Sequence, residues 1–201
     1  MTNFDERAKD WDSDPKKIER ARAVAAAIRA ALPLQPSMTA LEYGCGTGLL
    51  SFALQTDFAS ITLADTSEGM LDVLTAKIAA SAVPNMLPYR LDLSVDPLPA
   101  SRFDVAYSLM TLHHIPDTDQ ILRQFFALLA PGGWLCVADL DAEDGSFHTD
   151  GTTDVHLGFA RPALQKQVEA AGFRDVIFST AYTIQKIGKA FPVFLLTAKR
   201  P

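Results

Sequence analysis

A short apolar strand, a glycine-rich turn and a helix follow one another within residues 39–55 of this chain. The turn is Gly44-Cys45-Gly46-Thr47-Gly48, whose glycines permit tight bends and let main-chain atoms approach a ligand closely. The same alternation continues, which predicts a mostly parallel sheet covered by helices on both faces. We expect strands at residues 39–43, 60–64, 86–91, 103–109 and 134–138, and helices at residues 15–32, 49–55, 70–78, 117–129 and 161–171.

The last segment departs from this alternation. Residues 173–184 and 191–199 are predicted strands joined by only about half a dozen residues, too few for a crossover helix, so they must pair antiparallel. The prediction is a single three-layer α/β domain over residues 1–201, with a mostly parallel sheet and an antiparallel C-terminal hairpin. Its expected parts are an N-terminal segment and helix (1–36), a cofactor-binding core (37–140), a substrate-side loop (141–160) and a helix with the hairpin (161–201).

Composition disfavours several classes of partner. The net charge of -6 does not suit a nucleic-acid backbone or an anionic membrane. Two cysteines, Cys45 and Cys136, provide neither a disulfide framework nor a zinc cluster. The chain has no basic segment before an apolar run near its start and no long apolar stretch, so we expect a cytoplasmic protein without a membrane span.

Two acidic residues accompany the glycine turn. Asp65 ends the second predicted strand 21 residues after Gly44, a spacing at which a carboxylate can accept both hydroxyls of an adenosine ribose. Asp92 follows the third strand, where it can accept from an exocyclic amine such as that of adenine. Together with the turn, these carboxylates predict a nucleoside site at the carboxyl ends of the strands.

These motifs resemble those of the class I S-adenosylmethionine-dependent methyltransferases, and the resemblance covers nearly the whole chain. LEYGCGTG (41–48) is similar to the first family motif, with an acid two places before the glycine turn. LADTSEGM (63–70) resembles the second, RLDLS (90–94) the third, FDVAYSLMTLHHI (103–115) the fourth, and LLAPGGWLCVADL (128–140) the region of the fifth strand. The resemblance implies a Rossmann-like seven-stranded sheet in the order 3-2-1-4-5-7-6, with strand seven antiparallel.

The resemblance also implies S-adenosyl-L-methionine as cofactor and S-adenosyl-L-homocysteine as product. The glycine turn would hold the methionine part, Asp65 the ribose, and Asp92 with Leu93 the adenine. Met70 either packs on the adenine or is an ordinary core residue, and Trp11 either shields the sulfonium from water or staples the first helix to the sheet. The expected cofactor-binding residues are Trp11, Glu42, Gly44, Cys45, Gly46, Thr47, Gly48, Asp65, Thr66, Met70, Asp92, Leu93, Ser108 and Leu109.

Two adjacent histidines follow the fourth strand. His113 and His114 are candidate general bases, because imidazole titrates near neutral pH and an acceptor that carries a proton must lose it. Alternatively, one of the two points inward and is simply hydrogen-bonded. His148 and His156, in the polar loop after the fifth strand, match no familiar metal-ligand spacing even with Asp139 or Asp141, so we expect no metal site.

The residues at the end of the fourth strand indicate which class of molecule accepts the methyl group. Ser108-Leu109-Met110 replaces both the acid of metal-dependent catechol-type methyltransferases and the Asn/Asp-Pro-Pro-Tyr motif of base amino-methyltransferases. We therefore expect a small-molecule acceptor, with a protein side chain as the alternative, and no nucleic acid.

Two other functions stay open. One is a non-catalytic S-adenosylmethionine-binding sensor or assembly protein. The other is an NAD(P)-dependent oxidoreductase, for which Leu49 stands where a fingerprint glycine is needed. The Tyr182 and Lys186 pair, which short-chain dehydrogenases place on a helix, falls here on a predicted strand.

Overall fold

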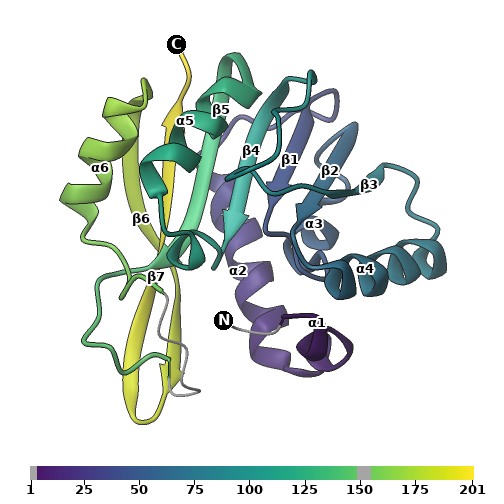
Figure 1. Ribbon diagram of the computed structural model, residues 1–201, viewed down its shortest axis with the longest axis horizontal. Helices are drawn as coiled ribbons and strands as arrows, with labels where there is room; N and C mark the ends of the chain where they lie inside the picture. Colours follow the sequence, from purple (N-terminus) through teal and green to yellow (C-terminus); the bar gives the residue numbers. More distant parts are fainter. Residues whose placement is uncertain (1–3, 149–154) are drawn as a thin grey trace.

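The computed structural model describes residues 4–148 and 155–201 (Figure 1). Within these residues, seven strands form one sheet in the order β3-β2-β1-β4-β5-β7-β6. Strands β1 to β5 pair in parallel, and β7 runs antiparallel to both β5 and β6. The strand order and the reversed strand are confirmed. The strands are β1 Thr39–Tyr43, β2 Ser60–Asp65, β3 Met86–Arg90, β4 Phe103–Leu109, β5 Leu129–Leu140, β6 Arg174–Lys186 and β7 Lys189–Lys199.

Helices cover both faces of the sheet, as predicted. One face packs against α2 (Pro15–Ala31), α3 (Leu49–Leu54) and α4 (Glu68–Ser81), whose buried apolar residues share one core cluster. The other face packs against α5 (Thr118–Leu128) and α6 (Arg161–Ala170), which belong to a second cluster. None of the helices within the described residues is long and apolar enough to cross a membrane.

Helix α2 begins and ends where the sequence predicts. The Asp14 side chain accepts a hydrogen bond from Lys16 N at 2.9 Å, and Pro15 occupies the first helical position, where no amide donor is needed. One face of the helix is apolar, and Ala21, Ala25 and Ile28 on that face are buried. Burial of such a stripe stabilises the helix more than its intrinsic propensity does.

The largest differences from the predicted strand boundaries lie at β5 and at the C-terminal hairpin. Strand β5 begins at Leu129, which pairs with Phe103, so residues 131–133 lie within the strand, next to a register shift between β4 and β5. The hairpin between β6 and β7 turns over Ile187 and Gly188 alone, both with positive φ (50° and 71°). Two such residues form the tightest hairpin turn, which is why the connection is shorter than expected.

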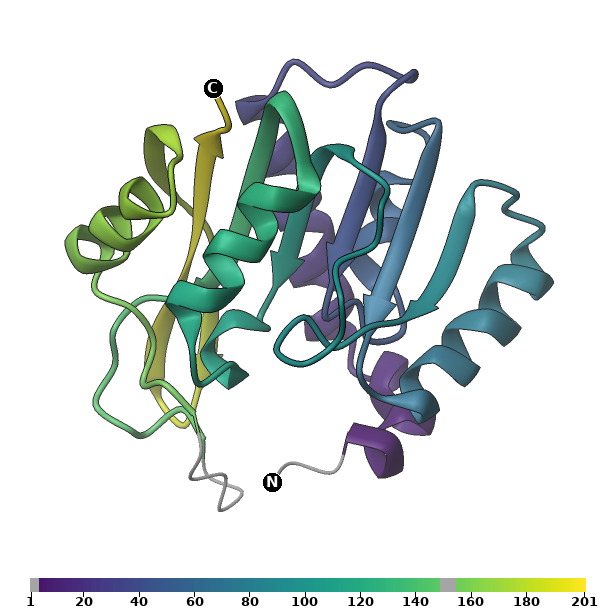
Figure 2. The ribbon, with the colours of Figure 1, turned by 45° about the horizontal axis from the view of Figure 1, so that its top comes forward.

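The N-terminal segment contains two short helices that the sequence did not predict. Helix α1 (Phe4–Arg7) and the 3-10 helix η1 (Ala8–Ser13) lie beyond the carboxyl ends of the parallel strands, next to the start of α4 (Figure 2). Asp5 Oδ1 accepts from Gly69 N at 2.9 Å, and Asp12 Oδ2 accepts from Lys77 Nζ at 2.7 Å. Side-chain contacts to α4, rather than helix propensity, hold this segment in place.

The first residue of the glycine turn leaves no room for a side chain. Gly44 has φ +69°, and a Cβ there would lie 2.2 Å from Cγ2 of Thr111. We expect Gly44→Ala to destabilise the domain by about 3 kcal/mol, because left-handed strain and overpacking add. Urea unfolding measures the difference. The matched control is Gly132→Ala, since Gly132 has φ +82° with nothing within 4 Å, and it should cost only about 1 kcal/mol. Equal costs at the two positions would contradict the steric explanation.

Candidate active site

The glycine turn wraps around the carboxyl end of β2. Gly44, Gly46 and Gly48 all have positive φ (69°, 53° and 78°), and the amides of Gly44 and Cys45 donate to Ala64 O at 2.8 and 3.0 Å. Gly46 N donates to Asp65 Oδ2 at 2.7 Å. The structure thus brings the turn and Asp65 together, as the sequence predicts.

Asp65 lies at the base of this turn. Its Oδ1 accepts from Ser67 N at 2.9 Å, while its Oδ2 accepts from Gly46. Burial raises the pKa of the Asp65 carboxyl above its usual value, although these amide hydrogen bonds act in the opposite direction. The carboxylate is therefore held rigidly at the point where β1 and β2 end.

Gly46 lies between two large side chains. A Cβ on Gly46 would be 3.8 Å from Met70 Sδ and 3.8 Å from Trp11 Nε1. Met70 is buried. Lys17 Nζ lies over the Trp11 ring, 3.4 Å from the ring centroid, in a cation–π contact. Met70 and Trp11 thus both border the turn, and their contacts with the adenine and the sulfonium stay predictions.

Asp92 and Leu93 lie at the end of β3. Asp92 Oδ1 accepts from Ser94 N at 2.9 Å, and Leu93 N donates to the Tyr43 hydroxyl at 3.1 Å. Burial raises the pKa of Tyr43 to about 12, so this hydroxyl stays protonated. The hydroxyl ties the ends of β1 and β3 together across the intervening strand β2.

Glu42 occupies a different environment from the other acids. It is 2% exposed and accepts a hydrogen bond from Ser51 Oγ, which in turn lies 2.7 Å from the Tyr107 hydroxyl. Burial raises the pKa of Glu42 to about 8, although the Ser51 hydrogen bond lowers it. Its carboxyl contacts α3 and β4 beneath the turn, and its cofactor role stays a prediction.

The other predicted cofactor residues lie in the turn, in strand β4 or, for Thr66, between β2 and α4. Thr47 is buried and donates to Asp12 of the N-terminal segment, whereas Thr66 is exposed. Ser108 is buried within β4 opposite Val137. Cys45 is also buried, and so is Cys136 in β5.

His113 forms a buried pair with Asp139. The two side chains are 1% and 0% exposed, and His113 Nδ1 lies 2.6 Å from Asp139 Oδ1. Burial opposes ionisation of Asp139, but the His113 ring and the hydrogen bonds from His113 and Leu140 outweigh it and lower the pKa of the carboxyl. The expectation that one of the two adjacent histidines points inward and is hydrogen-bonded is confirmed.

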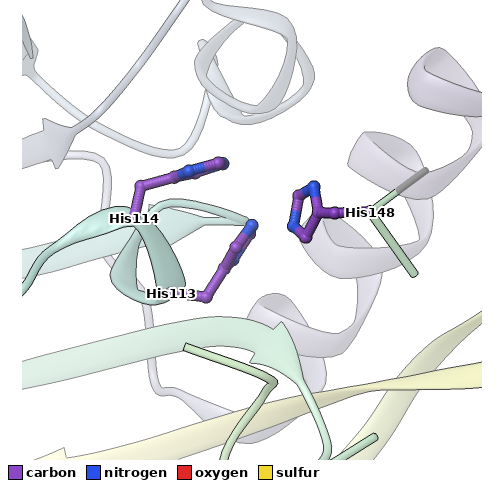
Figure 3. Close-up of side chains that lie close together, drawn as sticks. All are labelled: His113, His114 and His148. Atoms are coloured by element: carbon purple, nitrogen blue, oxygen red, sulfur yellow. The ribbon is translucent and has the colours of Figure 1, made fainter. Parts of the chain in front are cut away.

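Three histidine rings lie close together at this point (Figure 3). The His114 ring centroid is 4.1 Å from that of His113, and the His148 centroid is 5.3 Å from His113 and 5.6 Å from His114. Burial and the neighbouring His113 and His148 lower the pKa of His114 to about 3. His114 is therefore neutral at physiological pH and a weak proton acceptor, which disfavours it as a general base.

An aromatic chain links the histidines to the glycine turn. The Phe4 ring lies 5.2 Å from the His114 ring and 6.1 Å from the Trp11 ring, in both cases edge to face. Trp11 in turn borders Gly46. The N-terminal segment therefore covers the space between the turn and the histidines.

His156 lies outside the histidine cluster. Its Nε2 lies 2.9 Å from Ile115 O, and its ring packs on Phe159 at 5.4 Å. Residues 149–154 of the predicted substrate-side loop lie outside the described residues. His148 lies instead with His113 and His114, a grouping that the sequence did not predict.

Sequence reasoning missed several residues that shape this site. Phe4, Asp5 and Asp12 lie in short helices with no strong local pattern, so no sequence signal marks them. Thr111 was also missed. It follows Met110, a non-glycine residue with positive φ (55°) directly after β4, and this backbone feature is visible only in the structure. This tight turn at the end of β4 places the Thr111 side chain against Gly44, where Thr111 Oγ1 donates to Gly44 O at 3.2 Å.

Comparison with known proteins identifies the family. A family model described as a methyltransferase domain (Methyltransf_23) matches residues 17–177. The chain belongs to this family. The motifs therefore identified a class I methyltransferase fold correctly.

Curated relatives of this methyltransferase domain are longer than the chain. An uncharacterized methyltransferase of Schizosaccharomyces pombe is 33% identical over 118 residues, which are 55% of this chain and 42% of the relative. A ubiquinone biosynthesis O-methyltransferase of Coxiella burnetii is 30% identical over 139 residues (67% and 58%), and one of Xanthomonas campestris is 33% identical over 145 residues (68% and 58%). The chain spans about half the length of these relatives.

Solved structures share the fold of this methyltransferase domain. They include the [4+2]-cyclase SpnF (TM-score 0.74, 18% identity, 90% of this chain and 80% of that one). A phosphoethanolamine N-methyltransferase of Haemonchus contortus in complex with S-adenosyl-L-methionine has a TM-score of 0.74 at 13% identity, over 100% of this chain and 60% of that one. A methyltransferase of Aquifex aeolicus has a TM-score of 0.67 at 19% identity, over 94% and 99%.

The buried Glu42 carboxyl predicts a pH-dependent stability. Its pKa of about 8 in the folded state lies above the ordinary 4.5, so the native state retains a proton that the unfolded state releases. The stability that this proton provides is complete below about pH 4.5 and is lost as the pH rises through 8. Glu42→Gln, which stays neutral, should gain on the wild type by up to about 1.4 kcal/mol per pH unit in this window.

Urea unfolding at pH 5, 6.5 and 8 measures this trend. The matched control is Glu68→Gln, which removes an exposed carboxyl at the start of α4 and tests whether the trend requires burial. A constant difference for Glu42→Gln would contradict a protonated Glu42.

Proposed function

We propose that this domain transfers a methyl group from S-adenosyl-L-methionine to the hydroxyl of a small molecule and releases S-adenosyl-L-homocysteine. The observation that carries this is the convergence of the glycine turn, Asp65 and the histidines at the carboxyl ends of β1, β2 and β4. Ligands bind at such edges of open α/β sheets, where the strand order reverses. Membership of the methyltransferase family supports the same reaction.

The residues around the turn fit the cofactor. Bound S-adenosyl-L-methionine supplies an electrophilic methyl group on a sulfonium. Each carboxylate oxygen of Asp65 accepts one printed amide hydrogen bond, from Gly46 N or Ser67 N, and a carboxylate has about four acceptor positions, so capacity remains for a ribose hydroxyl. The main chain of the turn would hold the methionine part, and Asp92 with Leu93 the adenine. Met70 and Trp11 offer a soft and an aromatic surface beside Gly46.

The N-terminal segment is suited to exclude water. Trp11 and Phe4 form a continuous aromatic cover from Gly46 to His114. Asp12 bonds Thr47 of the turn and Lys77 of α4, which fixes this cover over both elements. Water exclusion matters because displacement on a sulfonium needs an aligned nucleophile and no competing solvent.

His113 is the better candidate to take a proton from the acceptor. Asp139 accepts from Nδ1, which orients the ring and leaves Nε2 as the nitrogen with a lone pair. His114, with its lowered pKa, would line the acceptor pocket rather than move protons. The sequence does not distinguish His113 from His114 as the general base, whereas this assignment favours His113.

The acceptor proposal is a small-molecule hydroxyl. The relatives named as ubiquinone biosynthesis O-methyltransferases support an oxygen acceptor. The net charge of -6 gives no support to a nucleic-acid acceptor, and a protein side chain stays the alternative. A cytoplasmic location also stays a prediction.

The two other functions have different support. SpnF, named as a [4+2]-cyclase, shares this fold, so the fold alone does not dictate methyl transfer and a non-catalytic or different activity stays open. The oxidoreductase alternative gains nothing, because Tyr182 and Lys186 both lie on strand β6. Four residues span about 13 Å along a strand, too far for the close pair that such enzymes use on a helix.

Binding of S-adenosyl-L-homocysteine tests the cofactor assignment. We expect micromolar or tighter binding in isothermal titration calorimetry. Asp65→Ala should weaken it by about 10-fold or more, because charge-assisted hydrogen bonds to the ribose contribute about 1.5–3 kcal/mol. The matched control is Asp57→Ala, since Asp57 bonds Arg29 on α2 and should leave affinity unchanged. Absence of binding heat with the folded wild type would contradict the assignment.

Turnover separates methyl transfer from a non-catalytic role. Incubation with S-adenosyl-L-methionine carrying a labelled methyl group and a panel of phenols and other small alcohols should yield labelled product. Cofactor binding with no transfer to any hydroxyl, thiol or amine would favour the sensor alternative.

A further inference from the structure

Three imidazole rings from two separate segments lie close together under the N-terminal segment that also borders the glycine turn. His113 and His114 follow β4, and His148 lies in the loop after the neighbouring strand β5. The three rings therefore lie together beyond the carboxyl ends of these two strands (Figure 3). One ligand atom from each lies within 4.8 Å of the other two. We propose that these three histidines bind a divalent transition-metal ion, for which Zn²⁺ is the best match.

Asp139 prepares His113 for this role. Its carboxylate accepts from His113 Nδ1 at 2.6 Å, which leaves Nε2 as the nitrogen able to bind a metal. Asp139 is itself fixed, because the amides of Leu140 and His113 donate to it at 2.7 and 3.2 Å. Metal-binding histidines almost always donate their other ring nitrogen to such a carboxylate, which sets the tautomer and strengthens the ligand.

The spacing of the three rings suits a small ion after a modest contraction. Zinc binds imidazole nitrogen at about 2.0–2.1 Å, so nitrogens in a tetrahedral site lie about 3.4 Å apart. The ligand atoms here all lie within 4.8 Å of one another, so ring rotations that move them by about 1 Å complete the site. His114 and His148 are only partly buried, whereas His113 is fully buried and held by Asp139.

The ligand chemistry selects the kind of metal. Among the described residues the cluster consists of imidazole nitrogens, and the carboxylate of Asp139 is engaged by His113. Magnesium and calcium require oxygen ligands, whereas imidazole suits zinc and its first-row neighbours. We therefore expect Zn²⁺ and Co²⁺ to bind and Mg²⁺ to have no effect.

Three protein ligands leave one position open. Catalytic zinc sites have this composition, with the fourth position taken by water or substrate. If the methyl-transfer proposal holds, on which this step rests, an acceptor hydroxyl or thiol would bind there as its anion and release its proton to water. The metal would then replace His113 as the group that prepares the acceptor, because both roles use the same Nε2 lone pair.

His156 provides a matched control in the same loop. Its Nε2 lies 2.9 Å from Ile115 O, away from the cluster, and its amide donates to His113 O at 2.8 Å, a main-chain contact that substitution retains. His156→Gln thus removes a histidine from this loop without removing a proposed ligand. His148→Gln and His114→Gln each remove one ligand, and neither disturbs the buried Asp139 pair.

Cobalt titration of the tag-free, metal-free chain tests the proposal. The wild type should bind one Co²⁺ with the intense visible bands of a tetrahedral site, and Zn²⁺ should displace it. His148→Gln and His114→Gln should each weaken binding by about 100-fold, since second-shell changes alone cost 10–100-fold. His156→Gln should bind as the wild type does, and circular dichroism checks that every variant is folded.

Three results would overturn the metal site. They are absence of stoichiometric Co²⁺ binding by the wild type, unchanged affinity in both ligand variants, and equal loss of affinity in His156→Gln. The test is independent of catalysis, because S-adenosyl-L-homocysteine binding is measured on the same proteins without metal. A failed metal titration with intact cofactor binding leaves the methyl-transfer proposal standing, with His113 as the base.

Discussion

The main chain of Gly44 passes so close to Thr111 that no side chain fits between them, and much of the site depends on this approach. It fixes the end of β1 against the residues that follow β4, at the place where the strand order of the sheet reverses. The turn can then curl around Asp65, while the chain after Thr111 enters the short 3-10 helix that carries His113 and His114. One steric constraint thus sets the distance between the cofactor residues and the histidines.

A buried charge fixes the other side of the site. Asp139 is the last residue but one of β5, has 0% exposure and is held by the His113 ring and by two main-chain amides. Burial of a carboxylate is costly unless it is paired and hydrogen-bonded, so the His113–Asp139 pair adds little net stability to the fold. Its clearer effect is to fix the orientation of the His113 ring. Strands β4 and β5 are neighbours, and the pair links their ends where the histidine rings meet.

The fold was largely predictable because hydrophobic periodicity, glycines and prolines act locally. The short connection between the last two strands required the antiparallel hairpin, and the motif spacing placed Asp65 beside the turn. The N-terminal helices were not predictable, because contacts such as Asp5 with Gly69 hold them rather than an apolar pattern. The histidine cluster was missed for a related reason: it joins His148 to His113 and His114 from a distant segment, and ligand spacing within one loop cannot reveal such a contact.

A crystal structure of the domain grown with S-adenosyl-L-homocysteine and Zn²⁺ tests the central claim most directly. That claim is that the glycine turn and the three histidines form one site under the N-terminal segment. We expect the ribose against Asp65, the thioether beside Gly46 and Trp11, and an anomalous zinc peak among His113, His114 and His148 on the same side. Cofactor density away from the turn, or a thioether that faces away from the histidines, would contradict the account.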